Sequence, residues 1–221
     1  MNELFQAAPF TVLTIAATSI VTAMAFRNYA VLERLLLSTS AILNGEWYRL
    51  LSSALVHGGW MHLLLNMFVL WSFGSFLETM IGTWRFGMLY VIGVLVASFT
   101  SVVMYRNLAD YRAVGASGGV SAVIGAVTVL FPTLGMYVFF IPIAIPAWIT
   151  AAAFMAYSVI GAQKMQGSIG HAAHLGGTVF GMGFAVAFYP HVFVQQWVYF
   201  LPMVAAVGIA YLYVRRQTIG R

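Results

Sequence analysis

The stretch GASGGVSAVIGAVTVLF, residues 115–131, decides how this chain folds. Its residues are small or apolar apart from three hydroxyl side chains, and the run stops before Pro132. Such a run predicts a helix buried in a membrane or among other helices. Ser117 stands at its beginning, directly after the polar loop that carries Arg106, Asp110 and Arg112.

The composition excludes an ordinary soluble domain. Hydrophobic residues make up 62% of the 221 residues and charged residues only 7%, whereas soluble domains carry about 25% charged residues. The length suffices for six or seven spans of about 20 residues each. The chain has no Cys, which excludes disulfides and thiolate catalysis. The net charge of +5 comes from few residues, so we assign it to membrane-flanking Arg and predict no nucleic-acid partner.

The apolar runs predict an all-α integral membrane protein with a six-helix core and a seventh, C-terminal transmembrane helix. Residues 1–191 form the predicted core, and residues 192–221 add the extra helix and a basic tail. Residues 27–61 predict an interfacial loop with short amphipathic helices. Residues 133–145 predict a hairpin or extended connection because Pro interrupts them. The predicted spans are 9–26, 62–81, 84–105, 117–131, 147–163, 169–189 and 192–214.

Ser117 is a candidate nucleophile. The first turn of a helix leaves backbone N–H groups unpaired and carries the positive end of the helix dipole. Both features suit the oxyanion of a tetrahedral intermediate, and Gly115 and Gly118 permit close approach of a substrate backbone. The alternative is packing, because Ser117, Ser121 and Gly125 form a stripe of small residues. Taken alone, the stripe favours packing.

His174 changes that balance, because a histidine inside a span is costly and usually marks function. The alternative is a helix–helix hydrogen bond. Small residues at four-residue spacing let two helices approach closely, and docking two such stripes would bring Ser117 and His174 to one seam. A base within reach of a hydroxyl is what nucleophilic catalysis requires. The stripes are Ala173, Gly177, Gly181, Ala185 and Gly118, Ala122, Ala126.

His62 and Asn66 are four residues apart and project from one side of a helix. With the backbone N–H of Ser117 they can complete an oxyanion hole. The alternative, a polar pair that pins this helix to its neighbours, has equal weight on these residues alone.

Acidic residues are too scarce for two other kinds of membrane protease. A paired-aspartate protease needs two carboxylates that share a proton. A metalloprotease commonly carries the His-Glu-x-x-His motif, whose two histidines bind the metal. Neither is present. We therefore predict no metal or cofactor, and a Ser-His dyad rather than a triad. The acidic residues are Glu3, Glu33, Glu46, Glu78 and Asp110.

With these residues the chain resembles the rhomboid intramembrane serine proteases. Three motifs carry the resemblance: Gly-x-Ser-Gly at 115–118, Ala-His-x-x-Gly-x-x-x-Gly at 173–181 and His-x-x-x-Asn at 62–66. The resemblance implies a rhomboid-like core with catalytic Ser117 and His174, and a site open to water on the first-loop side.

Further residues resemble supporting positions of that family. His57 resembles an upstream loop histidine, and Glu78 with Gly82 resembles a Glu-x-x-x-Gly motif. Arg49 resembles the arginine of a Trp-Arg motif, although Tyr48 precedes it here.

The chain departs from the family pattern at Ser121. The family often carries an aromatic residue at this position, and that ring stacks on the catalytic histidine. The resemblance therefore implies that this chain orients His174 by another group, such as a hydroxyl or a water. The seventh span resembles the six-plus-one arrangement of part of the family.

The resemblance also implies the partners and the location. The expected substrates are single-span membrane proteins that approach sideways through the lipid bilayer, near spans two and five, in the cell membrane. The runner-up function is a non-catalytic membrane protein that binds or escorts transmembrane clients. A channel or transporter is third, since no internal repeat is present.

Two arguments about orientation disagree. The loops after spans one, three and five, with the C-terminus, hold nine of the ten basic residues, and Arg85 alone lies on the other side. The positive-inside rule places that basic set in the cytoplasm. Ser117 opens toward the same set, and resemblance to bacterial rhomboids implies a site facing the exterior. We follow the orientation that the resemblance implies.

Overall fold

Long apolar helices dominate the computed structural model, which describes residues 6–108, 111–137, 143–164 and 170–219. The prediction of an all-α membrane protein is confirmed. The long helices are α2 (Pro9–Arg27), α6 (Trp60–Val69) with its continuation α7 (Ser75–Ile81), α8 (Thr83–Tyr105), α9 (Ser117–Leu130), α10 (Ala147–Lys164), α11 (His171–Phe188) and α13 (Phe200–Ile219).

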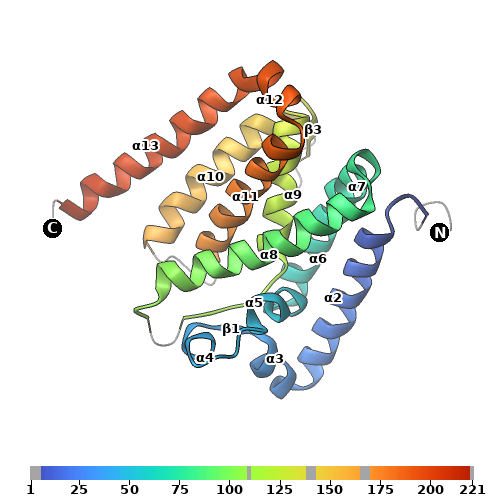
Figure 1. The fold of residues 1–221 in the computed structure, drawn as a ribbon. Coiled ribbons are helices and arrows are strands. Elements are labelled where there is room, and N and C mark those ends of the chain that lie inside the picture. The colour runs from blue at the N-terminus through green and yellow to red at the C-terminus, as the bar shows by residue number, and fades with distance from the viewer. Residues whose placement is uncertain (1–5, 109–110, 138–142, 165–169, 220–221) are drawn as a thin grey trace.

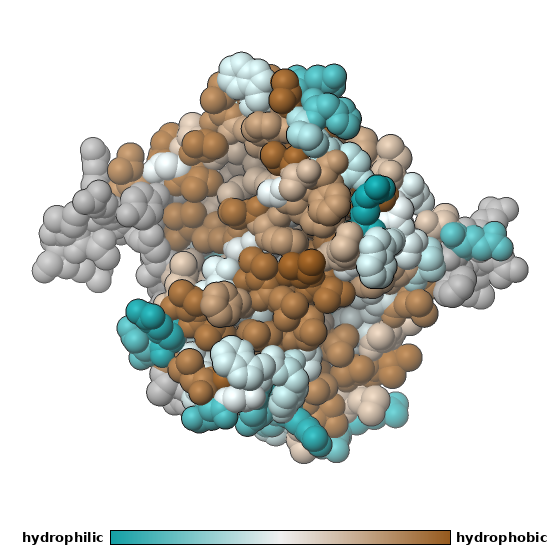
Figure 2. Space-filling view, viewed as in Figure 1, coloured by the Kyte–Doolittle hydropathy of each residue, from teal (hydrophilic) through white to brown (hydrophobic). Residues whose placement is uncertain are grey.

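Length and composition support a multi-pass membrane protein. Among the described residues, four helical segments are long and apolar enough to cross a bilayer, and two further apolar helices are shorter. Figure 2 shows apolar side chains over most of the centre of one face, with hydrophilic ones mainly around its margins. The four segments are Pro9–Arg27, Trp60–Ile81, Thr83–Tyr105 and Pro190–Ile209, and the shorter helices are Ser117–Leu130 and Ala147–Ala162.

Successive long helices run in alternating directions, so the connecting segments gather at two ends of the bundle (Figure 1). One end carries the first loop, whose strand β1 pairs antiparallel with β2 (Arg112–Ala113) just before α9. The other end carries the antiparallel pair β3 (Gly135–Met136) and β4 (Ile145–Pro146), where the sequence predicts a hairpin. The first-loop elements are α3 (Tyr29–Leu35), β1 (Leu37–Ser38), α4 (Thr39–Leu43), α5 (Arg49–Ser52) and the 3-10 turn η1 (Ser53–Leu55).

A buried carboxylate attaches α2 to the bundle. Glu78 on α7 accepts hydrogen bonds from the backbone N–H groups of Phe10 and Thr11, at 2.9 and 2.8 Å. These donors belong to the first turn of α2, where the helix supplies no partner of its own and the dipole favours negative charge. The acidic side chain is therefore satisfied although it is almost wholly inaccessible to solvent.

A π-helical turn, η2 (Leu70–Gly74), separates α6 from α7. A π turn holds one residue more than an α turn because its hydrogen bonds reach five residues back. The turn thus shifts the face presented by α7 relative to that of α6. Gly74 lies in this turn, where a Cβ atom would come within 2.9 Å of the Leu70 side chain.

Helix α9 packs against α11 through glycines. A Cβ atom at Gly177 would overlap the carbonyl oxygen of Gly118, and one at Gly181 would overlap that of Ala122. The backbones therefore approach more closely than any larger residue would permit, as small residues allow in membrane helices. This contact sets where the first turns of α9 and α11 lie relative to each other.

The seventh span differs from the continuous helix predicted at 192–214. The structure places α12 (Pro190–Gln196) and the 3-10 turn η3 (Trp197–Tyr199) before α13. Pro202 explains the interruption, since its ring would clash with the carbonyl of Val198 in a regular helix. Helix α13 then lies along α10, where Met203 is buried against a cluster that includes Ala151 and Met155.

Candidate active site

A cavity of about 640 Å³ opens between α6, α9, α10 and α11. Four residues singled out from the sequence line it: Ser117, His174, His62 and Asn66. They come from three helices and from positions up to 112 residues apart, so only the fold brings them together. Most of the remaining lining is apolar.

Ser117 is the first residue of α9 and is half-buried. The 14 residues of α9 extend about 21 Å, at about 1.5 Å per residue. A hydrocarbon core is about 30 Å thick, so α9 cannot reach from one interface to the other. The end of α9 that carries Ser117 borders the cavity, next to the first-loop residues Ser53 and His57 that bond the preceding segment.

The segment before Ser117 is held by backbone hydrogen bonds. Gly115 has φ = +121°, a left-handed conformation that side chains disfavour. Its N–H donates to the carbonyl of Ser53 at 2.9 Å, and the N–H of Ala116 donates to Nε2 of His57 at 3.2 Å. The direction from which the chain enters α9 is therefore determined by the first loop.

His57 is wholly buried and joins three segments. Because Nε2 accepts from the Ala116 N–H, the ring's proton is on Nδ1, which donates to Oγ1 of Thr22 at 3.1 Å. The Thr22 hydroxyl in turn donates to the Leu55 carbonyl. Burial, with a smaller contribution from nearby His62, lowers the pKa of His57 to about 3. His57 is thus a neutral structural link rather than a proton carrier.

His62 and Asn66 both face the cavity. The ring of His62 lies against the backbone of Gly115, where a Cβ atom would come within 2.7 Å of it. It also meets the His57 ring edge-on at 4.9 Å. One amide hydrogen of Asn66 is used within its own helix, in a bond from Nδ2 to the His62 carbonyl at 2.9 Å. An amide carries two such hydrogens, so a second donor remains.

His174 lies one turn into α11 and is nine-tenths buried. Within the described part of the chain, Ser117 and His174 share the cavity without a hydrogen bond between them, and Nδ1 of His174 has no hydrogen-bond partner. Catalytic hydrogen bonds often tighten only when substrate binds. The ring of Phe154, on α10, lies 5.1 Å from the His174 ring at an angle of 32°.

Arg49 organises the first loop beside the site. Its Nε donates to the carboxylate of Glu46 at 2.8 Å, and its Nη1 donates to the carbonyls of Glu33 and Leu36. The Tyr48 hydroxyl lies 2.9 Å from the same Glu46 carboxylate. One buried guanidinium thus ties α5 to α3 and to Leu36, the residue directly before β1.

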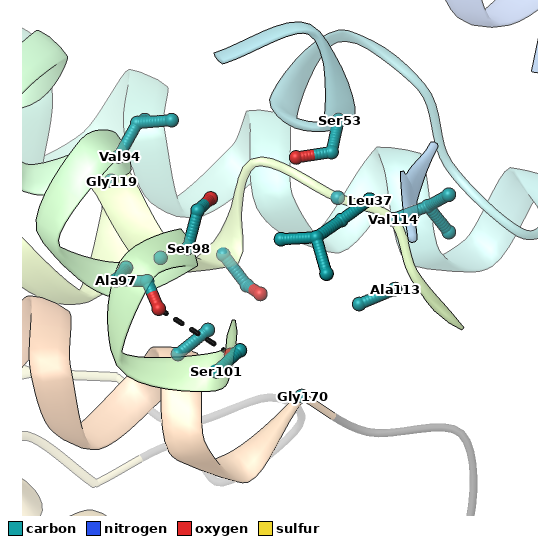
Figure 3. A pocket seen from close by; sticks show the side chains of 14 residues that line it. Leu37, Ser53, Val94, Ala97, Ser98, Ser101, Ala113, Val114, Gly119 and Gly170 are labelled. Atoms are coloured by element: carbon teal, nitrogen blue, oxygen red, sulfur yellow. Dashed lines mark hydrogen bonds between the residues drawn. The ribbon is translucent and has the colours of Figure 1, made fainter. Parts of the chain in front are cut away.

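A second, smaller cavity of about 30 Å³ also borders Ser117. It is lined by small side chains, among them the hydroxyl-bearing Ser53, Ser98 and Ser101, which Figure 3 shows around it. Ser117 therefore lies between a wide apolar cavity and a narrow pocket with polar groups in its wall.

No group of three or more His, Cys, Asp or Glu side chains suited to a metal ion occurs among the described residues. The available groups are a hydroxyl, imidazoles and amide donors, which suit acyl transfer.

Sequence reasoning missed Phe154 and Thr22. An aromatic residue and a hydroxyl in apolar helices carry no pattern that separates them from ordinary core residues. The available signal is the absence of an aromatic residue at Ser121, which leaves room for a ring from another helix beside His174.

Comparison with known proteins gives two findings. A sequence profile described as the Rhomboid domain matches residues 44–191. The chain is also similar to "Rhomboid protein 1, mitochondrial" of Saccharomyces cerevisiae, with 37% identity over 68 residues, or 31% of this chain and 20% of that protein. The chain thus matches about a fifth of that relative's length.

Proposed function

The chain belongs to the rhomboid family, and on that premise we propose that it is a serine endopeptidase that hydrolyses peptide bonds in or near transmembrane segments. The observation that supports this most is the single cavity shared by Ser117, His174, His62 and Asn66. It unites a hydroxyl, a base and the hydrogen-bond donors of an imidazole and an amide, at the end of a helix too short to cross the bilayer.

In the first step the Ser117 hydroxyl oxygen attacks the scissile carbonyl carbon while His174 takes the hydroxyl proton. The carbonyl oxygen becomes an oxyanion, which the backbone N–H of Ser117 and the side chains of Asn66 and His62 stabilise. His174 then gives its proton to the leaving amine nitrogen. The products are an ester on Ser117 and a free amine.

In the second step water attacks that ester, and His174 takes the water proton. The oxyanion forms again in the same position, and collapse returns the proton to the Ser117 oxygen with release of the carboxylic acid. No metal or cofactor takes part in this scheme.

The shape of the larger cavity supports a membrane-protein substrate. From His62 it extends along α6 as far as Val69, and along α9 as far as Ile124. An apolar wall of this kind suits a segment that arrives from lipid, and we propose single-span membrane proteins as substrates.

We place the enzyme in the cell membrane, as resemblance to bacterial rhomboids implies. Fractionation of cells expressing the full chain tests this. Recovery of the protein mainly with internal membranes, such as those of mitochondria, would contradict it.

Labelling with a fluorophosphonate tests the proposed activity without a known substrate. This reagent reacts with a serine that a nearby base activates. We expect the purified full chain to be labelled, and Ser117→Ala and His174→Ala each to abolish labelling and cleavage of a single-span reporter protein. The double variant should lose no more than either single variant, because the two residues act as one unit.

Ser72→Ala is the matched control, since the Ser72 hydroxyl donates to the Phe68 carbonyl within its own helix. It should be labelled like the wild type. Wild-type labelling in Ser117→Ala would refute the proposal. Co-purification of the reporter without any cleavage would favour a client-binding protein instead.

A further inference from the structure

We infer that Phe154 is a positioning residue that holds the His174 ring in the orientation needed to take the Ser117 proton. This inference rests on the proposed function. The two ring centroids are 5.1 Å apart at an angle of 32°, and both side chains line the larger cavity. This distance lies within the range of favourable aromatic pairs.

The polar surroundings of His174 do not fix its ring. Nδ1 is buried and has no hydrogen-bond partner in the described part of the chain. No carboxylate is near enough to be paired with it among these residues. On α9, the position one turn after Ser117 carries Ser121, a side chain too small to stack on the ring. The Phe154 ring is therefore the broad surface against which His174 rests.

Two more contacts fix where α10 presents this ring. Tyr157 meets His171 edge-on, with centroids 5.0 Å apart. Gly161 lies so close to the same histidine that a Cβ atom there would overlap its ring. Residues 154, 157 and 161 are spaced by three and four and share one helix face. This face contacts both histidines of α11, so the register between the two helices is determined beside the active site.

The predicted effect is on the chemical step. Without the Phe154 ring, the His174 imidazole gains rotational freedom and spends less time aligned with Ser117. Ground-state binding of a substrate does not require that alignment, whereas proton transfer does. Loss of the ring should therefore lower kcat and leave KM nearly unchanged.

The test compares Phe154→Leu, Phe154→Tyr and the wild type, in detergent and as full chains. Leu keeps an apolar side chain but removes the ring, whereas Tyr keeps the ring. We expect Phe154→Leu to lower both the fluorophosphonate labelling rate and kcat for a single-span reporter about tenfold, which corresponds to about 1.4 kcal/mol. Phe154→Tyr should stay within about twofold of the wild type. Phe99→Leu, at a half-exposed position on α8, is the matched control.

Several results would overturn the inference. Wild-type labelling of Phe154→Leu would show that the ring is dispensable. A raised KM with unchanged kcat would make Phe154 a substrate contact. Equal loss in Phe154→Leu and Phe154→Tyr would show that the ring itself is not what matters. The proposed function fails by a different observation, namely labelling that persists in Ser117→Ala.

Discussion

His57 connects the first helix, the first loop and the segment before Ser117 through both of its ring nitrogens. The acceptor role of Nε2 is available only to a neutral ring. Protonation would set an N–H against the N–H of Ala116 and would put a charge in a wholly buried position.

The stability of the protein should therefore fall in mild acid. The unfolded chain binds a proton at His57 near pH 6.5, whereas the folded chain does so only near pH 3. Between these values the unfolded state holds more protons, so stability decreases as pH falls, by about 1.4 kcal/mol per pH unit. Detergent unfolding midpoints between pH 7 and 4 measure this.

His57→Gln should remove that part of the pH dependence. His191→Gln, which changes an exposed histidine on α12, should keep it. The same pH dependence in His57→Gln as in the wild type would assign the effect to other groups.

Asn66 permits a test of the oxyanion hole. Asn66→Leu keeps the size of the side chain and removes its donors. Loss of one donor to an oxyanion costs about 10²–10³ in kcat, and we expect that loss for the reporter substrate with residual activity retained. Intact turnover together with a lower melting temperature would mean that Asn66 only packs α6 against its neighbours.

At the scale of helices, two glycines on α11 form a natural pair for comparison. A Cβ atom at Gly181 would overlap the Ala122 carbonyl, whereas one at Gly183 would meet nothing within 4 Å. Gly181→Ala should separate α9 from α11 and destabilise the protein by about 1–3 kcal/mol, as overpacking does, with loss of labelling at Ser117.

Gly183→Ala should leave labelling unchanged and stabilise the helix by up to about 1 kcal/mol. Melting curves and fluorophosphonate labelling of both variants measure the difference. Equal melting temperatures in the two variants would refute the close contact between α9 and α11.

Glu78 links two other helices. Glu78→Ala leaves two N–H groups of α2 without acceptors, and each unsatisfied buried group costs about 1–3 kcal/mol. We expect a lower melting temperature in Glu78→Ala and a smaller loss in Glu78→Gln, whose carbonyl still accepts. A melting temperature of Glu78→Ala equal to that of the wild type would show that α2 is held elsewhere.

Helix positions were predictable wherever an apolar run is bounded by Pro, Gly or charge. The predictions at 117–131 and 147–163 agree with α9 and α10 to within a residue. The break before α13 was predictable in principle from Pro202, but the high apolarity of 192–214 outweighed it. The π turn at 70–74 has no sequence signal of this kind, because contacts with the rest of the fold at both ends of the helix determine it.

The site was predictable only as a set of motifs. Ser117, His174, His62 and Asn66 stand out because polar residues are rare in such helices. The contacts around them could not be read from the chain, since no sequence pattern marks the packing of Phe154 against His174 or the bond between Thr22 and His57.

At the scale of the whole molecule, the orientation in the membrane decides on which side the proposed proteolysis takes place. Asn107 is exposed at the first-loop end, and the chain has no Cys. In the orientation that we follow, Asn107→Cys reacts with a membrane-impermeant thiol reagent in intact cells. Labelling only after lysis would reverse the orientation or place the protein in an internal membrane.

The Phe154 ring belongs to α10 rather than to α9, and it lines the same cavity as His62 and Asn66 of α6. A displacement of α10 wide enough to admit a polypeptide would carry this ring away from His174. Substrate entry and hydrolysis would then be unable to occur at the same time. On the proposed function, the protein would be unreactive while its cavity is open, and a membrane protein that leaves before α10 returns would not be cleaved.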